Sequence, residues 1–375
     1  MHQVYITTYQ GLEDSLFDEI VELGISQNRI KIVKRGVSVS DCTLKEVYQF
    51  NYELRCAIRV LINLASFQIR EVKDLHWKSK SINWHQWFEP SQTFKVDGIV
   101  NNSEEFNNPK YAAQVTKDGI VDCFKNTRSE RPDVDTYNPD IVIQVLVSKN
   151  NVTISLDSSG DSLHKRNYKS GSFRAPLSEV LAAGIIKKTG YKNGMDLYDP
   201  MCGSGTLLTE GYQIATKIPA GRYRDWWAFE NWSTYNEDEF LQVKEDAAQK
   251  EEEFKGNLFY GDQYLANVEM TEENLKNVGF YKMKEHSSDF FQSSKPSASG
   301  IMVMNPPYDV RLELDESQAF YKQIGDQFKK QYPGWKAGVF SGNIPALKAL
   351  GLKPSRRIPL WNGPIEARLF LYDMY

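Results

Sequence analysis

The chain has 375 residues, of which 41% are hydrophobic and 25% are charged, an ordinary globular composition. Its length alone predicts two domains. Forty-five Lys and Arg residues against 49 Asp and Glu residues leave a net charge of −4, which excludes a basic field over the whole chain. A nucleic acid would therefore have to bind at a local basic patch.

The cysteines predict neither a disulfide framework nor a zinc site, because they are widely spaced and form no Cys-x-x-Cys pair. They are Cys42, Cys56, Cys123 and Cys202. No metal is expected. The N-terminus has no basic segment followed by an apolar one, and no apolar run approaches the roughly 18 residues that span a bilayer. We expect a cytoplasmic protein without a membrane segment.

The N-terminal part reads as two small α+β units, residues 1–56 and residues 57–160. The first is predicted to contain strands over 4–8 and 29–39 and helices over 12–23 and 44–54, from period-two and helical spacing of its apolar residues. The second is predicted to contain strands over 93–100, 141–148 and 152–157 and a helix over 111–124, and residues 57–69 have strand character but could also form a helix. Lys149-Asn150-Asn151 indicates a hairpin between the last two strands.

A Ser- and Gly-rich linker, residues 161–175, separates these units from the rest of the chain. Four basic residues in it have no balancing acid after Asp161, and we predict that they bind RNA phosphates. They are Lys165, Arg166, Lys169 and Arg174.

From residue 176 onward strands and helices alternate, which predicts a parallel sheet. The strands are expected over 195–199, 258–262, 300–304 and 337–341, and the helices over 176–190, 205–217, 264–277, 316–332 and 344–350. Asn362-Gly363 predicts a terminal hairpin, 356–360 with 368–372, at an antiparallel edge. Residues 222–257 interrupt the alternation and read as an insertion that ends in a solvated helix.

A glycine-containing loop follows the first of these strands and precedes a helix. Its residues are Asp199, Pro200, Met201, Cys202, Gly203, Ser204, Gly205 and Thr206. The two glycines allow close approach of a ligand to the backbone. The loop lacks the third glycine of the dinucleotide fingerprint and the Gly-Lys-Ser/Thr of a phosphate loop. A carboxylate beside such a loop suits a ligand with an amino-acid end.

Carboxylates also follow the next two strand positions. Asp262, after Gly261, is placed to accept both hydroxyls of a ribose. Asp289 and Phe290 together could hold an adenine, through the carboxylate and the aromatic ring. Asp262 could equally be the N-cap of the following helix.

Asn305-Pro306-Pro307-Tyr308 follows the buried strand IMVM and is the strongest signal in the chain. An exocyclic amine of a nucleobase is a poor nucleophile, because its lone pair is delocalised into the ring. The Asn305 amide oxygen and the Pro306 carbonyl can each accept one N–H and so localise that lone pair. Tyr308 can stack on a base turned out of its helix. These three residues are the predicted catalytic residues.

The chain resembles the THUMP-domain class I methyltransferases, and most closely the bacterial 23S ribosomal RNA guanine-N2 methyltransferases. The matching segments are 162–166, 175–177, 199–206, 261–262, 274–279, 305–308 and 362–363. The resemblance covers essentially the whole chain, with specific motifs from residue 157 onward. Two departures are Asn167, where the family has glycine, and the long 222–257 insertion.

The resemblance implies a class I, Rossmann-like methyltransferase domain over 176–375, a ferredoxin-like region over 1–56 and an RNA-binding THUMP domain over 57–160. It also implies S-adenosylmethionine as cofactor and guanine N2 of 23S ribosomal RNA as acceptor. The 199–206 loop, Asp262, Asp289 and Phe290 would then bind the cofactor. Some family members carry a second methyltransferase domain, for which this chain leaves no room.

Other readings keep the chemistry and change the acceptor to a tRNA guanine, a DNA adenine or a protein glutamine. A DNA enzyme would be expected to have a sequence-reading domain, and a glutamine enzyme a helical N-terminal bundle, and neither fits residues 1–157. A non-catalytic RNA-binding assembly protein is disfavoured by the intact Asp199, Gly203, Gly205, Asn305 and Tyr308.

Overall fold

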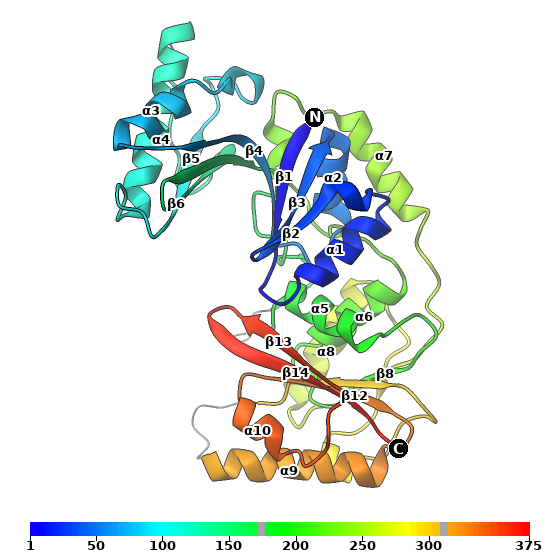
Figure 1. Ribbon diagram of the computed structural model, residues 1–375. Coiled ribbons are helices and arrows are strands. Elements are labelled where there is room, and N and C mark those ends of the chain that lie inside the picture. The colour runs from blue at the N-terminus through cyan, green and yellow to red at the C-terminus, as the bar shows by residue number, and fades with distance from the viewer. Residues whose placement is uncertain (129, 172–176, 308–313) are drawn as a thin grey trace.

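The computed structural model describes residues 1–128, 130–171, 177–307 and 314–375. Across these residues the strands form two seven-stranded sheets, one in each half of the chain (Figure 1). Within the same residues, no helix is long and apolar enough to cross a membrane. The predicted α/β class with two α+β units before a parallel sheet is confirmed.

The first sheet is shared by the two N-terminal units. Its strands, in spatial order, are β2 (Ile30–Val33), β3 (Gly36–Cys42), β1 (His2–Thr7), β4 (Arg59–Gln68), β7 (Asn151–Asp157), β6 (Ile141–Ser148) and β5 (Phe94–Asn101). Neighbours are antiparallel except β5 and β6. Since β4 pairs with β1 on one side and with β7 on the other, the two units form one continuous sheet.

The helices of this half are α1 (Glu13–Glu22), α2 (Leu44–Glu53), α3 (Val72–Lys80) and α4 (Pro109–Arg128). Thr43 and Glu46 begin α2 with a reciprocal capping box. The single strand predicted over 29–39 is wrong: Arg35 takes a left-handed φ of 58°, and the segment folds back as the β2–β3 hairpin. Helix α3 was not predicted, because it has few apolar positions.

The insertion completes the core of the N-terminal half. Its helix α7 (Glu237–Ala248) packs against α2, and Phe240, Val243 and Ala247 are buried. The Phe240 ring meets the rings of Tyr48 and Tyr52 edge-on, with centroids 5.9 and 6.0 Å away. The prediction of a solvated helix is therefore wrong, because the acidic residues occupy only its outer face.

The second sheet carries the predicted parallel strands. In spatial order they are β10 (Lys284–Glu285), β9 (Leu258–Tyr260), β8 (Leu197–Asp199), β11 (Ile301–Met304), β12 (Lys336–Ser341), β14 (Ile365–Asp373) and β13 (Arg356–Asn362). Strands β10 to β12 run parallel, whereas β14 pairs antiparallel with β12 and β13. The predicted terminal hairpin is confirmed, and Gly363 supplies its left-handed turn residue.

Helices cover both faces of this sheet. They are α5 (Glu179–Thr189), α6 (Thr206–Ala215), α8 (Leu265–Asn277), α9 (Leu314–Gln331) and α10 (Ile344–Ala349). Figure 1 shows α5, α6 and α8 between the sheet and the N-terminal half, with α9 and α10 on the opposite face. Along β11, Ile301 and Val303 pack in the core between the sheet and helices α5, α6 and α8. Met302 and Met304 pack in the core between the sheet and helices α9 and α10. The strand is thus buried on both faces, as its apolar run predicts.

The two halves meet through a buried ionic joint. Glu210 of α6 has a fully buried side chain and pairs with Arg55 at 3.0 Å and with Arg166 at 3.6 Å. The Tyr168 hydroxyl donates to the same carboxylate at 3.3 Å. Arg55 belongs to the N-terminal half and Arg166 and Tyr168 to the linker, so one carboxylate ties three parts of the chain together.

Arg224, in the insertion, holds the start of the linker. Its guanidinium donates to four backbone carbonyls, those of Ser159, Asp161, Ser162 and Lys165, at 2.9–3.2 Å. Burial lowers the pKa of Arg224 to about 10. The insertion therefore packs on the N-terminal half and also fixes the path of the linker.

Candidate active site

Three functional side chains follow the carboxyl ends of three adjacent strands. Asp199 ends β8, Asp262 lies two residues after β9, and Asn305 directly follows β11. Strand β8 lies between the other two, with Asp199 opposite Tyr260 and Tyr198 opposite Met302. The parallel register brings the predicted cofactor loop and the predicted catalytic motif to one edge of the sheet.

The glycine loop has the backbone that its sequence predicts. Gly203 and Gly205 adopt left-handed φ values of 54° and 70°, which L side chains rarely adopt. A Cβ on Gly205 would lie 2.7 Å from a Thr271 side-chain atom, so this glycine packs against α8. A Cβ on Gly203 would meet nothing within 4 Å, so the loop is open to a ligand at Gly203.

The other loop residues face inward. Met201 is half-buried against the core under α9, and the sulfur of the buried Cys202 accepts the Thr271 hydroxyl at 3.3 Å. Ser204 and Thr206 are buried and share a hydrogen bond of 3.1 Å between their hydroxyls. Their side chains shape the loop, and contact with a cofactor would have to come from its backbone.

Asp199 is 2% exposed. Burial raises its pKa to about 8; the N–H of Met201, donating at 3.1 Å, opposes this shift, and the nearby Asp262 adds to it. Among the described residues no cationic side chain pairs with this carboxyl group, so its charged form lacks an ionic partner there. The ammonium group of an amino-acid ligand would supply the missing positive charge.

Asp262 holds the glycine loop to α8. Its Oδ2 accepts the N–H of Gly203 at 3.0 Å, and its Oδ1 accepts the N–H of Tyr264 at 3.0 Å and the amide of Asn267 at 2.8 Å. A carboxylate has about four acceptor positions, so one remains for a ribose hydroxyl. The N-cap interpretation of Asp262 is wrong, because the N-cap residue of α8 is Tyr264, whose N–H donates to Asp262; the ligand contact stays a prediction.

A polar face of α8 supports the loop, and of its residues only Asn274, in the matching segment 274–279, was singled out from the sequence. Thr271 donates to the carbonyl of Gly203 at 3.0 Å, and Asn274 donates to that of Ser204 at 2.9 Å. The Asn274 oxygen also accepts the N–H of Ser170, so the linker and the loop meet at one side chain. Asn267, Thr271 and Asn274 recur at helical spacing, and this pattern was the signal available.

The adenine contact predicted for the Phe290 ring requires correction. Phe290 is 3% exposed and stacks on Tyr332 in the core under α9, so its ring is not free to stack on a base. The adjacent Phe291 is half-buried. Ser287, two residues before Asp289, is in close backbone contact with Gly261. The Asp289 Oδ1 accepts the N–H of Phe291 at 2.9 Å.

The Asn305 side chain presents an unused hydrogen-bond acceptor at this edge of the sheet. Its Oδ1 is buried and has no hydrogen-bond partner among the described residues. A buried acceptor without a donor costs about 1–3 kcal/mol, and a ligand that donates there would remove that cost. Pro306 is buried beside it. Tyr308, the predicted stacking residue, lies outside the described residues.

The basic linker differs from its prediction. Arg166 is 2% exposed and donates to the carbonyls of Leu163 and Arg55 in addition to pairing with Glu210, so it is a structural residue and cannot reach phosphate. Lys169 pairs at 2.8 Å with Glu179, which is buried. Lys165 is exposed, and its partner Asp161 is exposed too. Arg174 lies outside the described residues.

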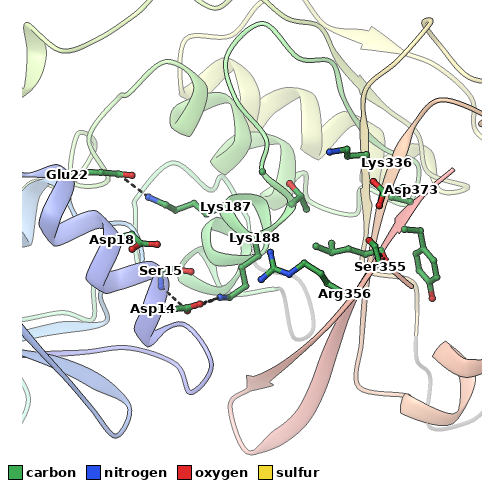
Figure 2. Close-up of a pocket in the computed structure, with 15 residues that line it drawn as sticks. Asp14, Ser15, Asp18, Glu22, Lys187, Lys188, Lys336, Ser355, Arg356 and Asp373 are labelled. Carbon is green, nitrogen blue, oxygen red and sulfur yellow. Dashed lines mark hydrogen bonds and ion pairs between the residues drawn. The ribbon is translucent and has the colours of Figure 1, made fainter. Parts of the chain in front are cut away.

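A charged cavity of about 550 Å³ lies between α1, α5 and the strands β12 to β14. Figure 2 shows Lys188 reaching Asp14 and Lys187 reaching Glu22 across it. Lys336 begins β12, so the cavity is at the amino edge of the sheet, opposite Asp199 and Asn305. It belongs to the contact between the two halves and not to the active site.

Three family models match the chain. The RMKL-like methyltransferase domain matches residues 166–370, the THUMP domain residues 70–157, and the RlmL ferredoxin-like domain residues 3–61. These matches confirm the resemblance inferred from the motifs.

Curated relatives match along the whole chain. A protein of Synechocystis sp. named "Putative RNA methyltransferase" is 32% identical over 99% of this chain and 96% of its own length. The ribosomal RNA large subunit methyltransferases K/L of Cellvibrio japonicus and Saccharophagus degradans are 32% and 34% identical over 100% of this chain. The chain spans 51% of the length of these two relatives.

Solved structures share the fold. A possible methylase from Clostridium difficile 630 is 28% identical with a TM-score of 0.89, covering 100% of this chain and 98% of its own. The methyltransferase SMU.472, solved with SAH, has a TM-score of 0.90 at 22% identity with the same coverage. On these matches S-adenosylmethionine is the cofactor, as expected, and the chain belongs to the RMKL-like methyltransferase family.

Proposed function

We propose that this protein transfers a methyl group to the exocyclic N2 amine of a guanine in 23S ribosomal RNA. The buried Oδ1 of Asn305, for which the described part of the chain provides no hydrogen-bond partner, carries the proposal, because it offers an acceptor for an amine N–H at the strand end next to Asp199. The names of the K/L relatives support ribosomal RNA as the substrate, and the THUMP match supports RNA in general. A ribosomal RNA substrate would be met in the cytoplasm.

Different residues of the chain would bind the cofactor and the acceptor base. When bound, S-adenosylmethionine supplies an electrophilic methyl group. The Asp199 carboxylate would pair with the ammonium of its amino-acid end, the open side of Gly203 would admit its backbone contacts, and Asp262 would accept a ribose hydroxyl. Asn305 Oδ1 and the Pro306 carbonyl would accept the two amine hydrogens, and Tyr308 would hold the extruded base. Their interaction strengthens as the nitrogen becomes pyramidal, which favours the transition state.

Lys165 and Lys169 remain proposed RNA contacts. A hollow of about 550 Å³ lies between the linker, Tyr9 and the hairpin tip at Asn362-Gly363, and Lys165 lines it. The hairpin tip is at the carboxyl edge of the sheet, because the start of β14 pairs with the end of β12. The hollow is therefore on the same side as the candidate active site.

We also propose a division of the chain into a ferredoxin-like region (1–56), a THUMP domain (57–160), a linker (161–175) and a methyltransferase domain (176–375). The matched ranges 3–61, 70–157 and 166–370 support it.

The test is single-turnover methyl transfer to unmodified 23S ribosomal RNA, followed by mass spectrometry of nucleosides. Asn305→Ala should lower the rate about 10²- to 10³-fold, the range for loss of one preorganised hydrogen-bond partner, with cofactor affinity nearly unchanged. Asn305→Asp still accepts hydrogen bonds and should retain more activity. Thermal denaturation of both variants controls for loop damage.

Wild-type turnover by Asn305→Ala would contradict the mechanism. Methylation of tRNA in place of ribosomal RNA, or of adenine in place of guanine N2, would contradict the proposed substrate.

A further inference from the structure

We propose that α3 carries a stacking site for an unpaired RNA nucleotide, with the Trp77 indole as the platform. The Trp77 side chain is 61% exposed although tryptophan is among the most apolar residues. Exposed tryptophans flanked by cations bind single strands, because every base presents a π-face and the backbone is anionic. The inference rests on the proposed function in taking RNA as the partner.

The charge around Trp77 fits a nucleotide. Lys80, one turn after it, places its ammonium 5.5 Å from the ring centroid, and Lys73 is exposed one turn before it. Lys78 is also exposed, and neither Lys78 nor Lys80 forms an ion pair with another described residue. The acid of this helix, Asp74, is used as a cap and accepts the N–H groups of Arg70 and Glu71. Lys73 pairs with the exposed Glu71 at 3.1 Å, so Lys78 and Lys80 are the cations near the ring that are available to phosphates.

Helix α3 is held rigidly, so the platform is preformed. Leu75 and Ser79 are fully buried against α4. A Cβ on Gly119 of α4 would lie 2.7 Å from the carbonyl of His76, so the two helices are in close backbone contact. The His76 ring meets Trp77 edge-on at 5.9 Å, and its Nε2 lies 3.1 Å from Asp122 of α4. A fixed aromatic ring loses little entropy when a base stacks on it.

A hollow of about 560 Å³ lies between α3 and α4, next to the turn of α3 that precedes Trp77, and is lined by Lys73, His76 and Val115 among others. Glu71, Glu105 and Asp118 also line it, and these carboxylates can accept base N–H groups but would repel phosphate. The hollow thus suits a base edge, while the lysines suit the backbone.

The same domain offers a matched control. Tyr137 is 98% exposed, more than Trp77, but the charged residues near it in the chain are the acids Asp133, Asp135 and Asp140, and its own N–H donates to Asp135. If exposed aromatic surface alone attracted RNA, Tyr137 would serve as well as Trp77. If the lysine-flanked Trp77 ring is the binding site, Tyr137 should not contribute to RNA affinity.

The experiment measures binding of a fluorescent 12-nucleotide oligouridine to the full chain by anisotropy, with a duplex RNA of equal length as comparison. Trp77→Ala should weaken binding of the single strand about 5- to 150-fold, as expected for one lost base stack. Trp77→Phe should retain most of the affinity, Tyr137→Ala should bind like wild type, and duplex affinity should change least. Lys78→Ala with Lys80→Ala should lower the salt slope by about one unit per lost phosphate contact.

Unchanged affinity in Trp77→Ala, equal loss in Tyr137→Ala, or no binding of oligouridine by wild type would overturn the inference. A dimer that Trp77→Ala dissolves would show that the ring binds a second copy instead. The assay needs no turnover. An inactive Asn305→Ala variant that binds oligouridine normally would therefore still support the proposed stacking site at Trp77. Loss of binding in Trp77→Ala with normal S-adenosylmethionine affinity would separate it from the cofactor site.

Discussion

Burial raises the pKa of the Asp199 carboxyl group to about 8, a shift that favours the neutral acid in the free protein near pH 7. A cationic ligand end next to it would favour the carboxylate and lower that pKa again. Cofactor binding is then coupled to proton release. The coupling follows from burial together with the lack of a cationic partner in the described structure.

We expect S-adenosylmethionine affinity to rise by up to about tenfold per pH unit between pH 5.5 and 7.5, as one proton leaves Asp199. Calorimetry in two buffers of different ionisation enthalpy should show release of up to one proton. Asp199→Asn should bind more weakly and release no proton. A wild-type binding enthalpy that is independent of the buffer would refute the coupling.

The sign of the stability effect follows from the same shift. The pKa of Asp199 is higher in the folded protein than in the unfolded chain. The contribution of this group to the stability is therefore fully present below about pH 4 and is lost as the pH rises toward 8. Asp199→Asn should therefore melt at a higher temperature than wild type at pH 8, with little difference at pH 4. This comparison is the folding control for the binding measurement.

At the scale of elements, α7 is a core helix with an acidic outer face. Phe240→Ala should lower the free energy of unfolding by about 3–5 kcal/mol, because it empties a site filled by the Phe240 ring against Tyr48 and Tyr52. Leu241→Ala, one position along and 46% exposed, should change it by no more than about 0.5 kcal/mol. Urea denaturation of the two variants checks this. Equal effects would mean that α7 is not docked as described.

Elements whose pattern is local were predictable, and those that depend on distant partners were not. The β6–β7 hairpin and helix α2 follow from alternation, turn residues and capping within their own segments. The buried face of α7 depends on α2, which lies far away in the chain, and α3 has too few apolar residues for a periodicity signal. Tertiary packing therefore determines both the burial of α7 and the formation of α3.

The same division holds for the candidate site. Asp199, Asp262 and Asn305 were found because carboxyl ends of parallel strands meet at one edge, a rule that needs no tertiary detail. The burial of Arg166 depends on Glu210, and that of Phe290 on Tyr332, and no local pattern reports such partners. Residue type alone therefore predicted ligand contacts for Arg166 and Phe290, whereas both side chains are buried.

At the scale of the whole molecule, the Glu210 joint holds the two halves together. Glu210→Gln should lower the free energy of unfolding by about 3–5 kcal/mol, because it leaves the buried Arg55 and Arg166 without their counter-charge. Asp161→Asn, which removes the exposed partner of Lys165, should cost less than about 1 kcal/mol. Denaturant unfolding measures both. A small effect of Glu210→Gln would show that the halves are held mainly by apolar contacts.

The core of the N-terminal half includes Trp227, Phe229, Trp232 and Phe240, which belong to the insertion. During synthesis the first 160 residues leave the ribosome well before these side chains are made. We therefore expect the nascent N-terminal half to keep part of its apolar surface uncovered until helix α7 of the insertion has been made. In this order of translation, the N-terminal half would finish folding after the linker and the first part of the methyltransferase sheet have emerged.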